Sequence, residues 1–362
     1  MRIIGCDLHS RQQTLAMLNV ETGEVEESVL SHEGNRVRQF YGTLPRPVRV
    51  GIEATGSMQW FLELMDELQI ECLVGHPAMI RAQEPRKQKN DRRDALLLLR
   101  LLVDKRFPAI WTPTVEQRDL RALLRHRHQW VRMRVRLQNT LQAIALSHGL
   151  RRGPKLWNQE GQRSLQELSL PPHTQDRRNE MMAMYQRLQG EIDVLDRQVA
   201  QVAEKRPLSR LLMTHPGVGP ITALATEVYV GDATRFRDGK ALSSYVGMIP
   251  AENSSGEKRR LGRLTKQGNA MLRFLWCEAV GHAVRQDVEL KRFYTRKLTQ
   301  KGLGKAKVAA GRKLGIRLWI MLRDQIDYNE FCRRRRPETG KPMQRGLVGN
   351  IVQPKAVTGD SE

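Results

Sequence analysis

The chain has 362 residues, with 61 Lys and Arg against 39 Asp and Glu and a formal net charge of +22. This balance favours a polyanionic partner, nucleic acid first, over an acidic small molecule, and an apolar content of 40% is too high for a disordered basic tail. No apolar run approaches the roughly 18 residues that span a bilayer, and the N-terminus lacks a secretory signal, so we expect a cytoplasmic protein without a membrane partner.

The first 110 residues predict a mixed sheet covered by helices. Periodicity predicts strands at 2–9, 13–20 and 24–31, a helix at 34–43, a strand at 48–54, a helix at 56–68, a strand at 71–76 and a helix at 91–105. Three antiparallel strands that continue into alternating strand and helix are typical of the ribonuclease H-like fold.

Four acidic residues fall where such a sheet would hold a ligand. Asp7 lies within or at the end of the first strand, Glu53 ends the fourth, and Asp91 and Asp94 are three apart on one helical face. Converging carboxylates would bind one or two Mg²⁺ ions, which suit displacement at phosphorus. Each acid alone could be a turn or helix-cap residue, but an aspartate buried in an apolar strand needs a compensating partner.

Residues 111–205 predict two long helices. The first, at about 115–148, is strongly basic, with Arg125 and Arg132 as candidate nucleic-acid contacts, and an apolar stripe follows it: Trp130, Met133, Leu137, Leu141 and Ile144. The second, at about 176–205, has a heptad seam: Met181, Tyr185, Leu188, Ile192, Leu195, Val199 and Val202. The pair could be an intramolecular helical hairpin or a dimerising coiled coil.

Residues 206–328 predict a mainly helical domain that contains the stretch ENSSGEKRRLGRLTKQGN, residues 252–269. Ser255 precedes a glycine and a group of cations, the surroundings that phosphoryl transfer to a hydroxyl requires, although loops that only bind nucleic acid often look alike. The candidate phosphate contacts are Arg259, Arg260, Arg263, Lys266 and Arg273. Thr265 is the expected N-cap of the helix that follows. Residues 329–362 predict a basic, flexible tail.

Five segments together resemble the DEDD/serine transposases of the IS110 insertion-sequence family: GCDLHS, GIEATGSMQWF, KNDRRDA, HPGVGPITA and YVGMIPAENSSGEKRRLGRLTKQGNAMLR. They cover most of residues 1–325 in the family's order. The resemblance implies a RuvC-like nuclease domain at 1–110, a coiled-coil linker at 111–205 and a serine transposase domain at 206–328. Its four metal-binding acids match Asp7, Glu53, Asp91 and Asp94, with Mg²⁺ as the usual metal, and its catalytic serine matches Ser255.

The resemblance also implies partners that composition and spacing do not reveal. Family members are thought to recombine donor and target DNA under the direction of a structured noncoding RNA, the bridge RNA, as homodimers that pair into tetramers. Two other functions stay open. One is a RuvC-like metal-dependent junction nuclease in which only the four acids react, and the other is a nucleic-acid-binding protein on a relic nuclease fold. Four acids retained in a basic chain count against the second.

Overall fold

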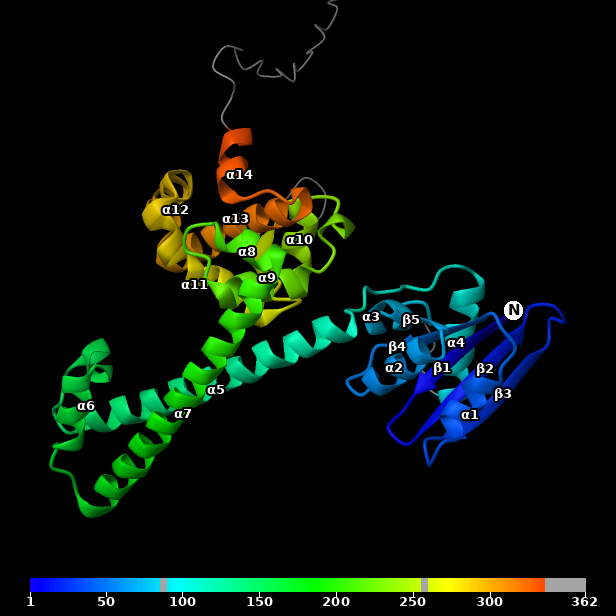
Figure 1. The fold of residues 1–362 in the computed structure, drawn as a ribbon, viewed down its shortest axis with the longest axis horizontal. Coiled ribbons are helices and arrows are strands. Elements are labelled where there is room, and N and C mark those ends of the chain that lie inside the picture. The colour runs from blue at the N-terminus through cyan, green and yellow to red at the C-terminus, as the bar shows by residue number, and fades with distance from the viewer. Residues whose placement is uncertain (85–89, 255–259, 336–362) are drawn as a thin grey trace, which may run out of the picture. The chain divides into compact units, whose positions relative to one another are not determined.

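The computed structural model describes residues 1–84, 90–254 and 260–335 and divides the chain into two compact units, residues 1–120 and 121–362 (Figure 1). Ser255 and Arg259, two of the predicted site residues, lie outside the described residues, as does the tail from residue 336. In the described part of the chain, no helix combines the length and the apolar composition needed to cross a membrane.

A five-stranded mixed sheet in the order β3-β2-β1-β4-β5 forms the centre of the first unit. Its strands are β1 (Arg2–Leu8), β2 (Gln12–Asn19), β3 (Val25–Ser31), β4 (Val48–Glu53) and β5 (Glu71–Gly75). The β1–β2 and β2–β3 pairs are antiparallel, whereas β1–β4 and β4–β5 are parallel. The predicted mixed sheet is therefore confirmed.

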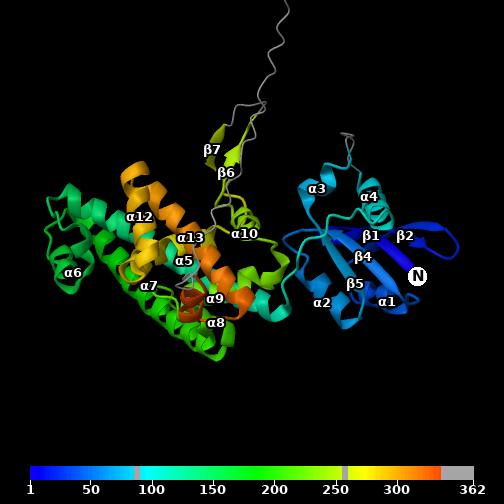
Figure 2. The same cartoon turned by 90° about the horizontal axis from the view of Figure 1, so that it is seen from above.

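Helices cover both faces of this sheet (Figure 2). Helices α1 (Arg36–Thr43) and α2 (Gln59–Glu67) pack on one face, where Tyr41 and Phe61 join the strand residues Ile4, Cys6 and Ile52 in one buried cluster. Helix α4 (Asp91–Val103) packs on the other face through Ala95 and Leu99. The short helix α3 (Pro77–Arg81) was not predicted.

Two long helices of the second unit form an intramolecular hairpin. Helix α5 (Val115–Ser147), which begins in the first unit, is followed by η1 (Gly153–Trp157), α6 (Gln159–Gln166) and α7 (Pro172–Lys205). Leu141 of α5 and Met182 of α7 belong to one buried cluster, and Arg134 Nη1 of α5 donates to Gln189 Oε1 of α7 at 2.8 Å.

The predicted seam of α7 is buried within this single chain at Tyr185, Leu188, Ile192, Leu195 and Val199. This burial supports the intramolecular hairpin among the two alternatives. On α5 the predicted stripe is wrong at Met133, which is 48% exposed, because the apolar periodicity does not show how far the partner helix covers each turn.

The rest of the second unit is mainly helical, as predicted. Its elements are α8 (Pro207–Met213), α9 (Pro220–Val230), η2 (Ala233–Arg235), α10 (Gly239–Tyr245), β6 (Pro250–Glu252), β7 (Leu261–Leu264), α11 (Ala270–Gln286), α12 (Val288–Lys301), α13 (Leu303–Asp324) and α14 (Tyr328–Arg335). The buried Trp276 of α11 donates from Nε1 to Thr226 Oγ1 of α9 at 3.0 Å, which links two of the central helices.

Three details of this unit differ from the sequence-based expectations. The antiparallel pair β6 and β7 was not predicted. The N-cap of α11 is Asn269, whose side chain accepts from the Leu272 amide at 2.8 Å, and not Thr265, because the helix begins only at Ala270. Residues 329–335, placed by the sequence in the tail, belong to α14.

Candidate active site

The strand register places Asp7 and Glu53 side by side. In the parallel β1–β4 pair, Cys6 lies opposite Ile52, so the next residues, Asp7 and Glu53, are neighbours at the carboxyl ends of the two strands. Cys6 and Ile52 are fully buried in the core with α1 and α2. Because side chains alternate along a strand, Asp7 and Glu53 face the opposite side of the sheet, which α4 covers.

Glycine lets α4 approach that face closely. A Cβ atom at Gly5 would lie 2.2 Å from the carbonyl oxygen of Ala95 and 2.4 Å from the amide nitrogen of Leu99, so the backbone of α4 rests directly on β1. Asp7 is two residues beyond Gly5 and on the same face. Asp91 and Asp94 occupy the first turn of α4. All four acids therefore lie on the face of the sheet that α4 covers, near the carboxyl ends of β1 and β4.

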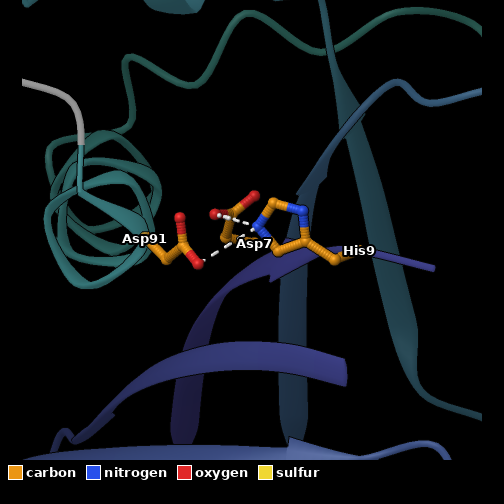
Figure 3. Close-up of side chains that lie close together, drawn as sticks. All are labelled: Asp7, His9 and Asp91. Carbon is orange, nitrogen blue, oxygen red and sulfur yellow. Dashed lines mark hydrogen bonds and ion pairs between the residues drawn. The ribbon is translucent and has the colours of Figure 1, made fainter. Parts of the chain in front are cut away.

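An imidazole lies between two of these carboxylates (Figure 3). His9 Nε2 is 3.0 Å from Asp7 Oδ2 and 3.6 Å from Asp91 Oδ2. Asp7, His9 and Asp91 each offer a ligand atom, and these atoms lie within 4.8 Å of one another. Glu53 and Asp94 are outside this close group, and they are placed by the strand register and by the helix.

The electrostatics of Asp7 reflect the crowding of negative charge. Burial raises the pKa of the Asp7 carboxyl, the neighbouring His9 opposes this rise, and the charges of Asp94 and Asp91 add to it. A cation at this point would relieve the repulsion among the carboxylates. Carboxylate oxygens suit a hard divalent ion, and a neighbouring imidazole can orient such a carboxylate by a hydrogen bond, so the side chains that the structure brings together fit a metal site.

Comparison with known proteins decides the family. A family model of the DEDD transposases of the IS110 type, described as "Transposase", matches residues 4–148, which include all four acids, and a second model, "Transposase IS116/IS110/IS902 family", matches residues 209–295. The two matches follow one another along the chain and together cover more than half of it. The chain belongs to the IS110 family of transposases.

Relatives of this transposase match it over about two thirds of its length. It is 29% identical over 251 residues to "Transposase for insertion sequence element IS1111A" of Coxiella burnetii, a match that covers 67% of this chain and 69% of that protein. It is 28% identical over 256 residues to "Probable family 20 transposase" of Pseudomonas aeruginosa, which covers 69% of this chain and 75% of that protein. The DEDD domain and the carboxylate–histidine cluster together indicate that the transposase depends on a divalent metal ion.

His9 is the residue of this site that the sequence analysis missed. The segment GCDLHS contains the pattern that indicates it. Residues two apart at a strand end lie on the same face of the sheet, so His9 faces α4 as Asp7 does. The expectation considered carboxylates alone as metal ligands and did not include the imidazole.

The basic residues predicted to contact nucleic acid differ from one another in their exposure to solvent. Arg125, Arg132, Arg260, Arg263 and Lys266 are exposed. The guanidinium of Arg273 is engaged within the fold, because its Nη1 donates to the carbonyl oxygens of Val246, Gln267 and Gly268 at 2.8, 3.0 and 3.2 Å. This arrangement gives Arg273 a structural role in holding the turn before α11.

Ser254, the neighbour of the predicted nucleophile, takes part in the β6–β7 hairpin. Its hydroxyl donates to Glu252 Oε1 at 2.9 Å and accepts from the Arg260 amide at 3.1 Å, and the Asn253 amide donates to the Arg260 carbonyl oxygen at 3.0 Å. The Ser254 hydroxyl is therefore committed to hydrogen bonds within the hairpin. Ser255 itself lies outside the described residues.

Proposed function

We propose that this chain is an insertion-sequence transposase that cleaves and exchanges DNA strands with four acids, Asp7, Glu53, Asp91 and Asp94, and with the Ser255 hydroxyl as nucleophile. The observation that carries the proposal is the close approach of Asp7, His9 and Asp91. It is supported by Asp94 in the same first turn of α4 and by the strand register that puts Glu53 next to Asp7. Three antiparallel strands that lead into parallel β4 and β5, with helices on both faces, support a RuvC-like, ribonuclease H-like domain.

The four acids would hold one or two divalent ions, with Mg²⁺ favoured by their carboxylate oxygens. A bound ion of this kind stabilises the negative charge that develops on phosphate oxygens during displacement. His9 orients the Asp7 carboxylate through the 3.0 Å contact, in the way that groups around metal ligands commonly fix them.

Ser255 would attack a DNA phosphodiester. Its Oγ–P bond forms while the bond between phosphorus and the leaving DNA oxygen breaks, and the strand stays on the protein as a phosphoserine ester until a DNA hydroxyl displaces it. Arg259, Arg260, Arg263 and Lys266 would bind the phosphate oxygens. The family resemblance supports guidance by a structured noncoding RNA and action as a homodimer that pairs into a tetramer.

The deciding experiment traps the covalent intermediate. The transposase is incubated with Mg²⁺, DNA carrying its element's ends and target, and the element's RNA, then denatured, and the adduct is mapped by mass spectrometry. We expect an adduct on the peptide that contains Ser255, and no adduct or strand exchange with Ser255→Ala. Asp7→Asn should also abolish cleavage while it leaves DNA binding largely intact, because the basic surfaces remain.

Ser254→Ala is the matched control. It removes the adjacent hydroxyl and its two hydrogen bonds, each worth about 1 kcal/mol, so the hairpin should loosen while the adduct still forms. Normal cleavage by Ser255→Ala, with no adduct from the unmodified protein, would contradict the serine mechanism. The four acids would then be the whole active site, as in a junction nuclease.

A further inference from the structure

Helix α12 and the first half of α13 carry a strongly basic stretch of sequence. Around the turn at Gly302, α12 packs along α13 (Figure 1), and we call residues 288–313 the basic arm. This segment contains nine Lys and Arg and one acid, Glu289. Five of the cations are exposed: Lys291, Arg292, Arg296, Lys301 and Lys305.

The single acid does not balance this charge. Glu289 Oε2 accepts from Arg317 Nη2 at 2.9 Å, and Arg317 is a buried residue of α13 outside the arm. Within the arm, Lys307 has an acidic partner on another helix, since its Nζ is 2.6 Å from Glu278 Oε1 of α11. The exposed cations therefore leave a large local excess of positive charge.

Like charges are also placed close together in the arm. Lys313 Nζ lies 4.8 Å from the centroid of the Phe293 ring, and Arg296 Cζ and Lys297 Nζ each lie 5.9 Å from it. Arg292 and Arg296 are four residues apart on α12, a spacing at which like charges cost a helix roughly 0.2–0.5 kcal/mol. A polyanion bound to the arm would remove this repulsion and release its own counterions.

We propose that the basic arm binds the sugar-phosphate backbone of double-stranded DNA without reading its sequence. The chemistry is that of ammonium and guanidinium groups on phosphate oxygens. DNA, the substrate of a transposase, is a polyanion that could bind this surface. The site is distinct from the proposed function, because backbone binding requires neither the four acids nor Ser255.

Salt dependence of binding tests the arm in the full chain. Binding is measured by fluorescence anisotropy, without divalent ions, on a DNA duplex that lacks the element's sequences, from 50 to 200 mM salt. For the double variant Arg292→Gln and Arg296→Gln, we expect the slope of log K against log salt to shrink by about 1.8, since each lost phosphate contact removes about 0.9. The melting temperature should stay the same or rise slightly, because both side chains are exposed and their mutual repulsion is removed.

The matched control is Arg187→Gln with Arg197→Gln, which removes the same charge from exposed positions of α7. We expect its slope to equal that of the unmodified protein. An unchanged slope in the arm variant, or an equal loss in both variants, would overturn the proposal, because only net charge would then matter. The titration is repeated with an RNA duplex of equal length, and a loss of slope in the arm variant that occurs only with RNA would also overturn the proposal.

Discussion

His9 is the imidazole partner among the carboxylates of the candidate site, and its removal tests how the site is oriented. The 3.0 Å contact with Asp7 and the 3.6 Å contact with Asp91 place one imidazole nitrogen between the two acids. We predict that His9→Ala raises the Mg²⁺ concentration for half-maximal strand cleavage by roughly 10–100-fold, the usual cost of losing a group that orients a metal ligand. His9→Gln keeps a hydrogen-bond donor and should lose less.

The measurement is a Mg²⁺ titration of cleavage by the three proteins at one pH. Equal curves for all three would show that His9 does not orient the acids. A loss of cleavage that no Mg²⁺ concentration restores would assign His9 a more direct part in the reaction.

A second histidine, His215, links stability to pH. Its side chain is buried beside Arg317 and Asp287, and Nδ1 donates to the Pro216 carbonyl oxygen at 2.9 Å. Burial lowers the pKa of His215 from 6.5 to about 4, and the charge of Arg317 adds to the effect. The unfolded chain therefore binds more protons than the folded chain between pH 6.5 and about 4.

We predict that the free energy of unfolding is unaffected by His215 above pH 6.5 and falls as the pH drops toward 4, by at most about 1.4 kcal/mol per pH unit from this group. Urea unfolding at pH 7 and pH 5 measures the difference. His215→Gln should reduce the pH dependence, whereas His173→Gln, at an exposed position, should keep it. The same pH dependence in both variants would assign the loss to other groups.

At the scale of elements, the contact between β1 and α4 positions the acids. Gly5 allows this contact, and α4 carries Asp91 and Asp94 in its first turn. We predict that Gly5→Ala lowers the free energy of unfolding by about 1–3 kcal/mol, because the new methyl group would meet backbone atoms of α4 that cannot move independently. Strand cleavage should fall as well, since the displaced helix carries two of the acids.

Gly42→Ala is the control for this substitution. Gly42 lies in α1, and a Cβ atom there meets nothing within 4 Å, so alanine should be neutral or slightly stabilising. Thermal unfolding and cleavage are measured for both variants. Wild-type stability and activity in Gly5→Ala would show that α4 is not held against β1 as the structure indicates.

The elements themselves differ in how far the sequence predicts them. The strands β1 to β5 and helix α4 follow from strong periodicity, and the strand ends then place Asp7 and Glu53 together. The pair β6 and β7 has only three and four residues, too few for an alternating pattern to stand out from a loop. The segment GCDLHS indicates that His9 shares a face with Asp7, but the contact of His9 with Asp91 depends on the packing of α4 against the sheet, which local sequence does not encode.

At the scale of the whole molecule, the positive charge belongs to one unit. Residues 1–120 contain 16 Lys and Arg against 17 Asp and Glu, whereas residues 121–362 contain 45 against 22. The four acids therefore lie in a unit that is nearly neutral, although the chain as a whole is strongly basic. We therefore expect electrostatic attraction for nucleic acid to come from the second unit.

This division predicts the behaviour of the first unit alone. A fragment of residues 1–120 contains the whole sheet and its buried clusters, so it should fold independently. We predict that it binds duplex DNA weakly and with a salt slope near zero, whereas the full chain shows a steep slope. Anisotropy titrations from 50 to 200 mM salt compare the two proteins.

Tight, salt-dependent binding by the fragment would mean that a local group of its cations, and not net charge, recruits DNA. With the expected result, the acids of the first unit would supply the chemistry and the cations of the second unit the affinity, so catalysis and affinity would be separable by mutation.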